Sequence, residues 1–310
     1  MFTTLSGVLF ILLMVEFILG NFANAFIALV NCIGWMKREK LSSVDRIFIA
    51  LAISRIALLW VILRSSFSPI DNPAVFTLTE KFIHNTWTVA NHFSMWSDTL
   101  LSIFYLLRIA NFSSLLFLHV KKRVESIMVE VILGSCVFLV CNLVMVNITQ
   151  HVQAKLYDTN ETWEILIVSN SIVRTLSSCI PFAMSLLCFL LLTYSLCKHL
   201  RKMKLNARHF QDSSTRVHIR AIQNVVSFLF LFALYFLCVV LSFWSYQMMS
   251  KSVILFCRAI AIIYPSTHSF VLIWGNKKLK RTFLLVLWQV TCWRKRTKMS
   301  KSLGFSQERP

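Results

Sequence analysis

Four polar or aromatic residues in the first third of the chain have the spacing of one helix face. Trp87, Asn91, Ser94 and Asp98 are separated by four, three and four residues, which places them on the same side of a helix. Most of the surrounding residues are apolar, and a carboxylate on such a helix is too costly to face lipid. We expect this face either to line a cavity, with an aromatic wall and an amide for hydrogen bonds, or to bond to neighbouring helices.

No pattern typical of catalysis or of metal binding accompanies this face. The sequence has neither Gly-x-Ser-x-Gly nor His-Glu-x-x-His, and His92, His151 and His268 are scattered along it. We therefore expect a protein with no enzymatic activity, no metal site and no cofactor.

The elements that must position these residues are membrane spans. Of the 310 residues, 57% are hydrophobic and 15% are charged, whereas a soluble protein carries about 25% charged residues. A helix needs about 20 largely apolar residues to cross a bilayer. Seven segments qualify, roughly at 5–33, 47–67, 86–117, 126–147, 173–197, 225–247 and 253–275. The sequence predicts an all-α, seven-transmembrane-helix bundle that forms a single domain over residues 1–310.

The distribution of Lys and Arg predicts the orientation. The first, third and fifth connections and the tail at 276–310 hold 24 of them, and the other three connections hold 3. This asymmetry places the N-terminus outside the cell and the tail in the cytoplasm. The net charge of +19 is divided among these short loops, so we expect contact with anionic lipid rather than with nucleic acid.

Two sequons for N-glycosylation agree with this orientation. Asn147 begins Asn-Ile-Thr and Asn160 begins Asn-Glu-Thr, and both flank or fill the predicted outer connection between spans 4 and 5. We expect glycans at these two positions.

The segment after the last span predicts a short amphipathic helix on the inner leaflet. It reads NKKLKRTFLLVLWQVTCW, with apolar residues at helical spacing and basic residues before or opposite them. Cys292 in this segment is either a palmitoylation site or an unmodified thiol.

Motifs in six of the spans, with their inner ends, together resemble one known family. They read GNFANAFIALVN, LSSVDRIFIALAISRIALLW, FYLLRIANFSSLLFLHVKKRV, LLTYSLCKHLRKMKLNA, HIRAIQNVVSFLFLFALYFL and HSFVLIWGNKKLKRTFL. The chain resembles the type 2 (bitter) taste receptors, a family of G-protein-coupled receptors. Like that family, it lacks Asp-Arg-Tyr at the end of span 3 and Asn-Pro-x-x-Tyr in span 7.

The resemblance implies a role for particular residues of this chain. It places the ligand pocket at Trp87, Asn91, Tyr235 and Arg258. It places an interhelical polar network at the set Asn24, Arg55 and Ser269, and the surface that faces the G protein at the set Lys121, Lys122, Arg123, His218 and Arg220.

The resemblance also implies a function. It predicts a multi-pass plasma-membrane receptor that binds small bitter compounds from outside and activates a heterotrimeric G protein of the gustducin type, which leads to phospholipase C and calcium release. The alternatives are a vomeronasal-type pheromone receptor and a seven-helix transporter. The oligomeric state is open.

One pocket position departs from some relatives, which carry a glutamate that suits amines where this chain has Arg258. Guanidinium groups bind carboxylate or sulfonate bidentately, so we expect a preference for anionic or strongly hydrogen-bond-accepting ligands. Arg64 and Arg174 also lie near the outer ends of their spans. Each side chain could either reach the pocket or extend to the lipid headgroups, and we favour the headgroups for both.

Overall fold

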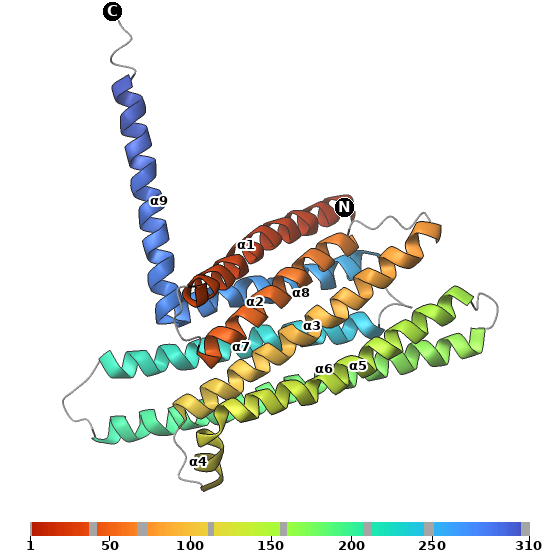
Figure 1. Ribbon diagram of the computed structural model, residues 1–310, viewed down its shortest axis with the longest axis horizontal. Coiled ribbons are helices and arrows are strands. Elements are labelled where there is room, and N and C mark those ends of the chain that lie inside the picture. The colour runs from red at the N-terminus through yellow and green to blue at the C-terminus, as the bar shows by residue number, and fades with distance from the viewer. Residues whose placement is uncertain are drawn as a thin grey trace, which may run out of the picture.

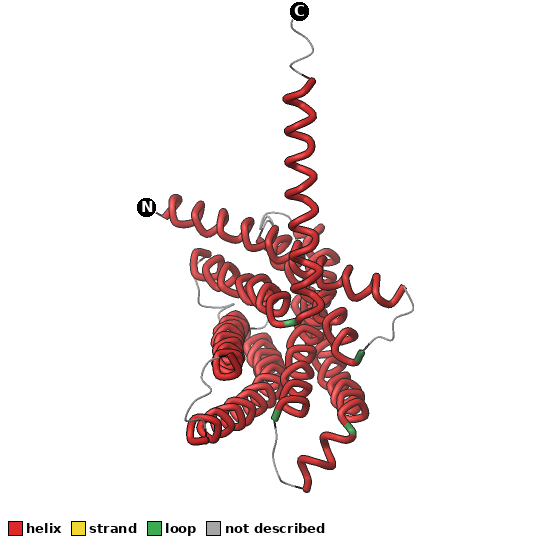
Figure 2. The backbone as a smooth tube through the Cα atoms, turned by 90° about the vertical axis from the view of Figure 1, so that its left-hand side faces the viewer, coloured by secondary structure: helices red, strands yellow, loops and turns green. Residues whose placement is uncertain are grey.

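The computed structural model is a bundle of long α-helices that lie side by side (Figure 1). It describes residues 2–36, 42–66, 73–110, 115–155, 160–206, 213–244 and 251–304. In chain order the helices are α1 Phe2–Met36, α2 Ser43–Ser66, α3 Pro73–Ile109, α4 Leu115–Lys122, α5 Val124–Lys155, α6 Asn160–Asn206, α7 Ser213–Trp244, α8 Lys251–Gly275 and α9 Lys277–Gly304. The described residues include no β-strand (Figure 2), and the predicted all-α bundle is confirmed.

Hydropathy separates the bundle helices into two groups. Within the described ranges, α1, α2, α5, α6 and α7 are each long and apolar enough to cross a membrane, and α8 contributes a shorter apolar stretch, Ala259–Gly275. Helix α3 is less apolar because it holds a series of polar residues that are buried in the bundle: Thr88, Asn91, His92, Ser94, Ser97, Asp98, Thr99 and Ser102. The polar helix is therefore the central one, and its neighbours shield it.

Helix α5 shows how the bundle meets lipid. Val129, Leu133, Val137, Val140 and Val144 recur at helical spacing, and each is at least half exposed on the bundle surface. In water such an apolar stripe would be a liability, whereas in a bilayer it contacts acyl chains. The stripe supports the assignment of α5 as a span.

Helix α3 ends earlier than the sequence predicted. It stops at Ile109, and the chain continues as the short helix α4 from Leu115, so the predicted span at 86–117 is wrong at its inner end. The apolar residues from Leu115 onward extended the predicted span, because a hydropathy count does not separate two helices that follow each other closely.

Helices α1 and α8 approach each other closely at Gly20. A Cβ atom on this residue would collide with the side chains of Ser266 in α8 and Leu59 in α2. Because the two helices are so close, the Ser266 hydroxyl can donate a hydrogen bond to the backbone carbonyl of Glu16 at 2.9 Å. Glycine is required here for its size.

The two prolines inside described helices are tied to neighbouring helices. Pro181 lies in α6 and Pro265 in α8. Thr99 of α3 donates to the Pro181 carbonyl at 3.0 Å, and Asn24 of α1 donates to the Pro265 carbonyl at 3.1 Å. Each proline removes a backbone bond from its own helix, and the bond that its own carbonyl accepts ties that helix to α3 or α1.

Helix α9 leaves the bundle across the direction of the other helices (Figure 1). Asn276 caps it, since its side-chain oxygen accepts from the backbone N–H of Lys278 and Leu279 at 2.9 and 3.2 Å. Leu279 is fully buried and Phe283 packs against Phe26. The apolar residues beyond them are exposed, as expected for a helix on a membrane surface, and α9 is longer than the predicted short helix.

Candidate functional site

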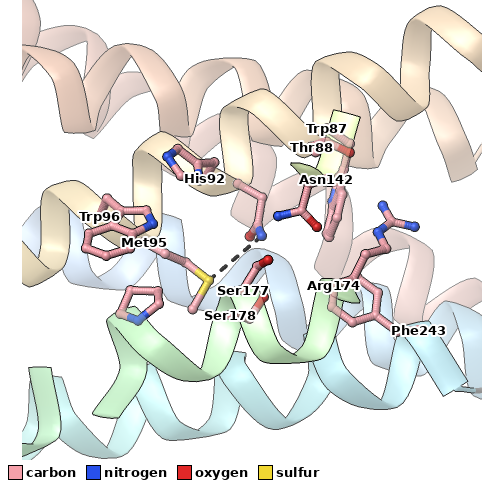
Figure 3. A pocket seen from close by; sticks show the side chains of 12 residues that line it. Trp87, Thr88, His92, Met95, Trp96, Asn142, Arg174, Ser177, Ser178 and Phe243 are labelled. Atoms are coloured by element: carbon pink, nitrogen blue, oxygen red, sulfur yellow. Dashed lines mark hydrogen bonds between the residues drawn. The ribbon is translucent and has the colours of Figure 1, made fainter. Parts of the chain in front are cut away.

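A narrow cavity lies between α3, α5, α6 and α7 (Figure 3). Its volume is about 20 Å³, and it is lined by Trp87, Thr88, Asn91, His92, Met95, Trp96, Asn142, Arg174, Ser177, Ser178, Pro181 and Phe243. Met95 and Trp96 lie at one end, and Arg174 and Phe243 lie at the other. The second end is the one nearer the start of α3 and α6, on the side of the N-terminus.

Helical periodicity brings these residues to the cavity. On α3, Trp87, Asn91 and Met95 are each four residues apart, so their side chains project from one face. On α6, Arg174, Ser177 and Pro181 follow at intervals of three and four residues and form the opposing wall. Two of the predicted pocket residues, Trp87 and Asn91, therefore line the cavity.

Tyr235 of α7 contacts the cavity residue Asn91 from outside the cavity. Its hydroxyl donates to Asn91 Oδ1 at 2.5 Å, and its side chain is 2% exposed. The Asn91 amide nitrogen meets Met95 Sδ at 3.8 Å. With both ends of the amide engaged, the orientation of Asn91 is fixed, so Tyr235 positions a cavity residue without being part of the lining.

Arg174 lies in the cavity wall. Its guanidinium carbon lies 4.9 Å from the Trp87 ring centroid and 4.8 Å from that of Phe243. Of the two positions open to Arg174, the pocket contact therefore has support in the structure, because the two rings give the guanidinium a cation–π environment. Arg64 is exposed at the end of α2 and does not contact the cavity. The side chain of Arg258, in α8, lies outside the described residues.

Two buried polar atoms in the cavity lining have no hydrogen-bond partner among the residues that the structure describes. They are Nε1 of Trp96 and Oδ1 of Asn142, whose side chains are 4% and 7% exposed. A buried polar group without a partner costs about 1–3 kcal/mol. One donor and one acceptor thus remain available to a molecule that enters the cavity.

A buried charge pair lies deeper in the bundle, beside the cavity. Arg55 of α2 donates from Nη2 to both oxygens of Asp98 on α3, at 3.0 and 2.9 Å, and neither side chain is exposed. Tyr264 of α8 donates to Asp98 at 2.6 Å. His268 Nδ1 lies 2.6 Å from Arg55 Nη2. Because a guanidinium only donates, this nitrogen is the acceptor and His268 is the neutral Nε2–H tautomer.

The network extends to the first helix. Arg55 Nη1 donates to the Ser269 hydroxyl at 3.1 Å, and Ser269 donates to Asn24 Oδ1 at 2.7 Å. Hydrogen bonds therefore join Asn24, Arg55 and Ser269, the three residues that the resemblance suggested. Sequence reasoning missed the roles of Asp98, Tyr264 and His268, although Asp98 stood out as a carboxylate on the polar face of α3.

Comparisons with known proteins decide the family. A family profile described as "Taste receptor protein (TAS2R)" matches residues 1–291. "Taste receptor type 2 member 20" of Homo sapiens is 53% identical over 302 residues, which cover 95% of this chain and 98% of that protein. "Taste receptor type 2 member 46" of Homo sapiens is 50% identical over 309 residues, which cover 97% and 100%. The chain belongs to the type 2, or bitter, taste receptor family. It is a multi-pass membrane receptor and not an enzyme.

Part of the predicted G-protein surface of this taste receptor is described. Lys121 and Lys122 end α4, and Arg123 follows; Lys122 and Arg123 are exposed. Lys121 donates to the Ala110 carbonyl at 3.3 Å and so ties α4 to the end of α3. For the set His218 and Arg220, the structure gives a position in the first turns of α7 but describes no side chain. The described basic residues lie at the end of the bundle opposite the N-terminus.

The two sequons of the receptor differ in their local structure. Asn147 lies within α5, where its amide donates to the Leu143 carbonyl at 2.7 Å and contacts Asn85 at 3.4 Å. Asn160 is the first residue of α6 and its side chain is not described. Because α5 continues to Lys155, Asn147 is part of a helix and not of a connection.

A second hollow of about 640 Å³ lies among α2, α3 and α5 of the receptor. It opens on the bundle surface, since Ile53 and Phe82 in its lining are 57% and 71% exposed. Its only strongly polar members are Asn85 and Asn147, which pair with each other. The cavity at α6 differs from this hollow, because two of its lining polar atoms have no partner among the described residues.

The described residues contain no group of His, Cys, Asp and Glu side chains that could hold a metal ion. The cavity offers hydrogen bonds, aromatic contacts and one positive charge, which is the chemistry of reversible ligand binding.

Proposed function

We propose that this receptor binds small bitter compounds from the extracellular side in the cavity between α3, α5, α6 and α7. One observation carries the proposal: the cavity of a taste receptor family member is lined by the unpartnered Trp96 Nε1 and Asn142 Oδ1. Trp87 and Asn91 are proposed to contact the ligand directly, with Tyr235 holding Asn91 in place. Arg258 is proposed as a further ligand contact from α8.

The size of the cavity bears on how it would work. Pockets for drug-sized ligands have volumes of about 300–1,000 Å³, whereas this one measures about 20 Å³. The described arrangement is proposed to be the contracted state. A bitter compound activates the receptor by binding an expanded arrangement better than this one, since a ligand shifts a population only by its difference in affinity.

The proposed output is a heterotrimeric G protein of the gustducin type, followed by phospholipase C and calcium release. The exposed Lys122 and Arg123 and the basic start of α7 support a cytoplasmic docking surface. The excess of Lys and Arg at this end supports a cytoplasmic C-terminus and an extracellular N-terminus in the plasma membrane.

A calcium assay tests the proposal. Cells that express the receptor with a promiscuous G protein are exposed to a panel of bitter compounds, and we expect at least one agonist whose potency falls in Trp87→Ala and Asn91→Ala. Agonists whose potency is unchanged in both variants would place the ligand elsewhere.

The Arg258 contact has a test of its own. Arg258→Glu is expected to shift the response from acids toward amines, because it replaces a cation with an anion at the same position. Unchanged selectivity would exclude Arg258 from ligand discrimination.

A further inference from the structure

We propose that Arg174 at the end of the cavity selects ligands that carry a carboxylate or sulfonate on a flat aromatic body. The inference rests on the proposed function of the cavity as the ligand site. It assigns the charge recognition to α6, independently of Arg258.

Arg174 carries a positive charge that no described side chain neutralises. Among the side chains that the structure describes, none gives Arg174 an ion pair or a hydrogen bond; its described contacts are the faces of Trp87 and Phe243. The guanidinium of Arg55, by contrast, has Asp98, Ser269 and His268 around it. A guanidinium carries five N–H donors, and those of Arg174 lie in the wall of a cavity.

Two aromatic rings lie beside the Arg174 guanidinium. Trp87 and Phe243 are edge-to-face, with centroids 5.6 Å apart and planes at 88°, and the Arg174 guanidinium lies over both. The two perpendicular rings contact the guanidinium but offer it no described hydrogen-bond acceptor, so its N–H groups are left to bind a ligand. Carboxylate and sulfonate accept such donors bidentately, in the plane of the guanidinium. An aromatic body attached to the anion would then contact the same rings.

Farther inside, the cavity lining offers one hydrogen-bond donor and one acceptor. Trp96 Nε1 and Asn142 Oδ1 lack partners in the same cavity, and Figure 3 shows Trp96 at the end opposite Arg174. A ligand with an anion at Arg174 and a second polar group at its far end would bind these atoms too. A cationic ligand would instead approach a positive charge that no described carboxylate neutralises.

The test uses four probes that share one aromatic body and differ in the attached group: 2-naphthoate, naphthalene-2-sulfonate, 2-naphthamide and 2-naphthylmethylamine. Binding to the full-length receptor in nanodiscs is measured by isothermal titration calorimetry, without a signalling step. We expect the two anions to bind at least about tenfold more tightly than the amide, since hydrogen bonds between charged groups exceed neutral ones by about 1.4 kcal/mol or more. We expect the amine to bind weakest.

Three variants locate the effect. Arg174→Gln should bring the ratio of naphthoate to naphthamide affinity close to one. Arg174→Lys, which keeps the charge and serves if the glutamine variant does not fold, should give an intermediate ratio because ammonium lacks the planar fork. Arg64→Gln removes an exposed arginine outside the cavity and should leave the ratio unchanged.

Several results would overturn the inference: no binding of any probe to the wild-type receptor, no preference for the anions, or a preference that survives in both Arg174 variants. Equal loss in Arg64→Gln would attribute the preference to a general surface charge. The proposed function fails separately. A receptor that binds naphthoate selectively but gives no calcium response would refute the signalling proposal and leave the assignment of Arg174 intact.

Discussion

Replacing Asp98 should damage this receptor more than replacing the arginine that it pairs with. Asp98→Asn keeps the shape of the side chain but leaves the Arg55 guanidinium, which is 0% exposed, without a counter-charge. A guanidinium stays charged in proteins, and an uncompensated buried charge costs about 3–5 kcal/mol. Ser269 and His268 offer Arg55 only neutral acceptors.

Arg55→Met leaves a different residue behind. A lone carboxyl group can take up a proton and become neutral, and Asp98 keeps the Tyr264 hydroxyl as a donor. The free energy of unfolding should then fall by about as much as one buried unsatisfied polar group costs, which is about 1–3 kcal/mol. In the double variant both charges are absent, so the two losses should not add, and we expect the double variant to be more stable than Asp98→Asn alone.

Thermal unfolding in nanodiscs measures the three variants. A thiol-reactive dye reports unfolding, because the receptor has nine cysteines, all free, and seven of them are partly or fully buried. At roughly 2 °C per kcal/mol for a chain of this size, the midpoint should fall by about 6–10 °C in Asp98→Asn and by about 2–6 °C in Arg55→Met. Arg64→Met, at the exposed end of α2, is the matched control. Equal losses in the two single variants, or an additive double variant, would refute the reasoning.

Three further substitutions test other parts of the structure. Tyr235→Phe removes the hydroxyl that orients the α3 amide, and the agonist concentration for half-maximal calcium response should rise roughly fivefold; an unchanged value would show that the amide needs no support. Gly20→Val places a side chain where α1 meets α8 and should lower surface expression and the unfolding midpoint, whereas Gly7→Val, where a Cβ meets nothing within 4 Å, should change neither. Asn160→Gln should remove most of the glycan, seen as a mobility shift on a gel, and Asn147→Gln should remove little, because that amide is bonded within α5; the reverse pattern would contradict the helical assignment of Asn147.

The spans and the polar face of α3 were predictable because each depends on local periodicity. Hydropathy located all seven bundle helices, and the spacing of Trp87, Asn91 and Asp98 identified the inward side of α3. The partner of Asp98 was not predictable in this way. Arg55 is 43 residues away in sequence, and the spacing within one helix contains no information about which residue of another helix it meets.

Arg174 shows a different limit. An arginine near the outer end of a span can extend to the headgroups or turn inward, and its own position in the sequence does not distinguish the two. The signal available lay in its neighbours, since Ser177 and Ser178 follow Arg174 at helical spacing and so place further polar groups on the same side of α6. The end of α3 at Ile109 was missed because a hydropathy count does not register where one helix ends and the next begins.

The buried ion pair has a consequence for how the protein enters the membrane during synthesis. Helix α2 would expose Arg55 to lipid if it left the insertion machinery alone, at a cost of about 2.5–3.5 kcal/mol, and α3 would do the same with Asp98. The two helices are consecutive and their charges are 43 residues apart. We expect the insertion machinery to retain α2 until α3 has been synthesised, so that the two helices enter the bilayer together as one hairpin. The α8 residues of the network would then join after most of the chain has been made.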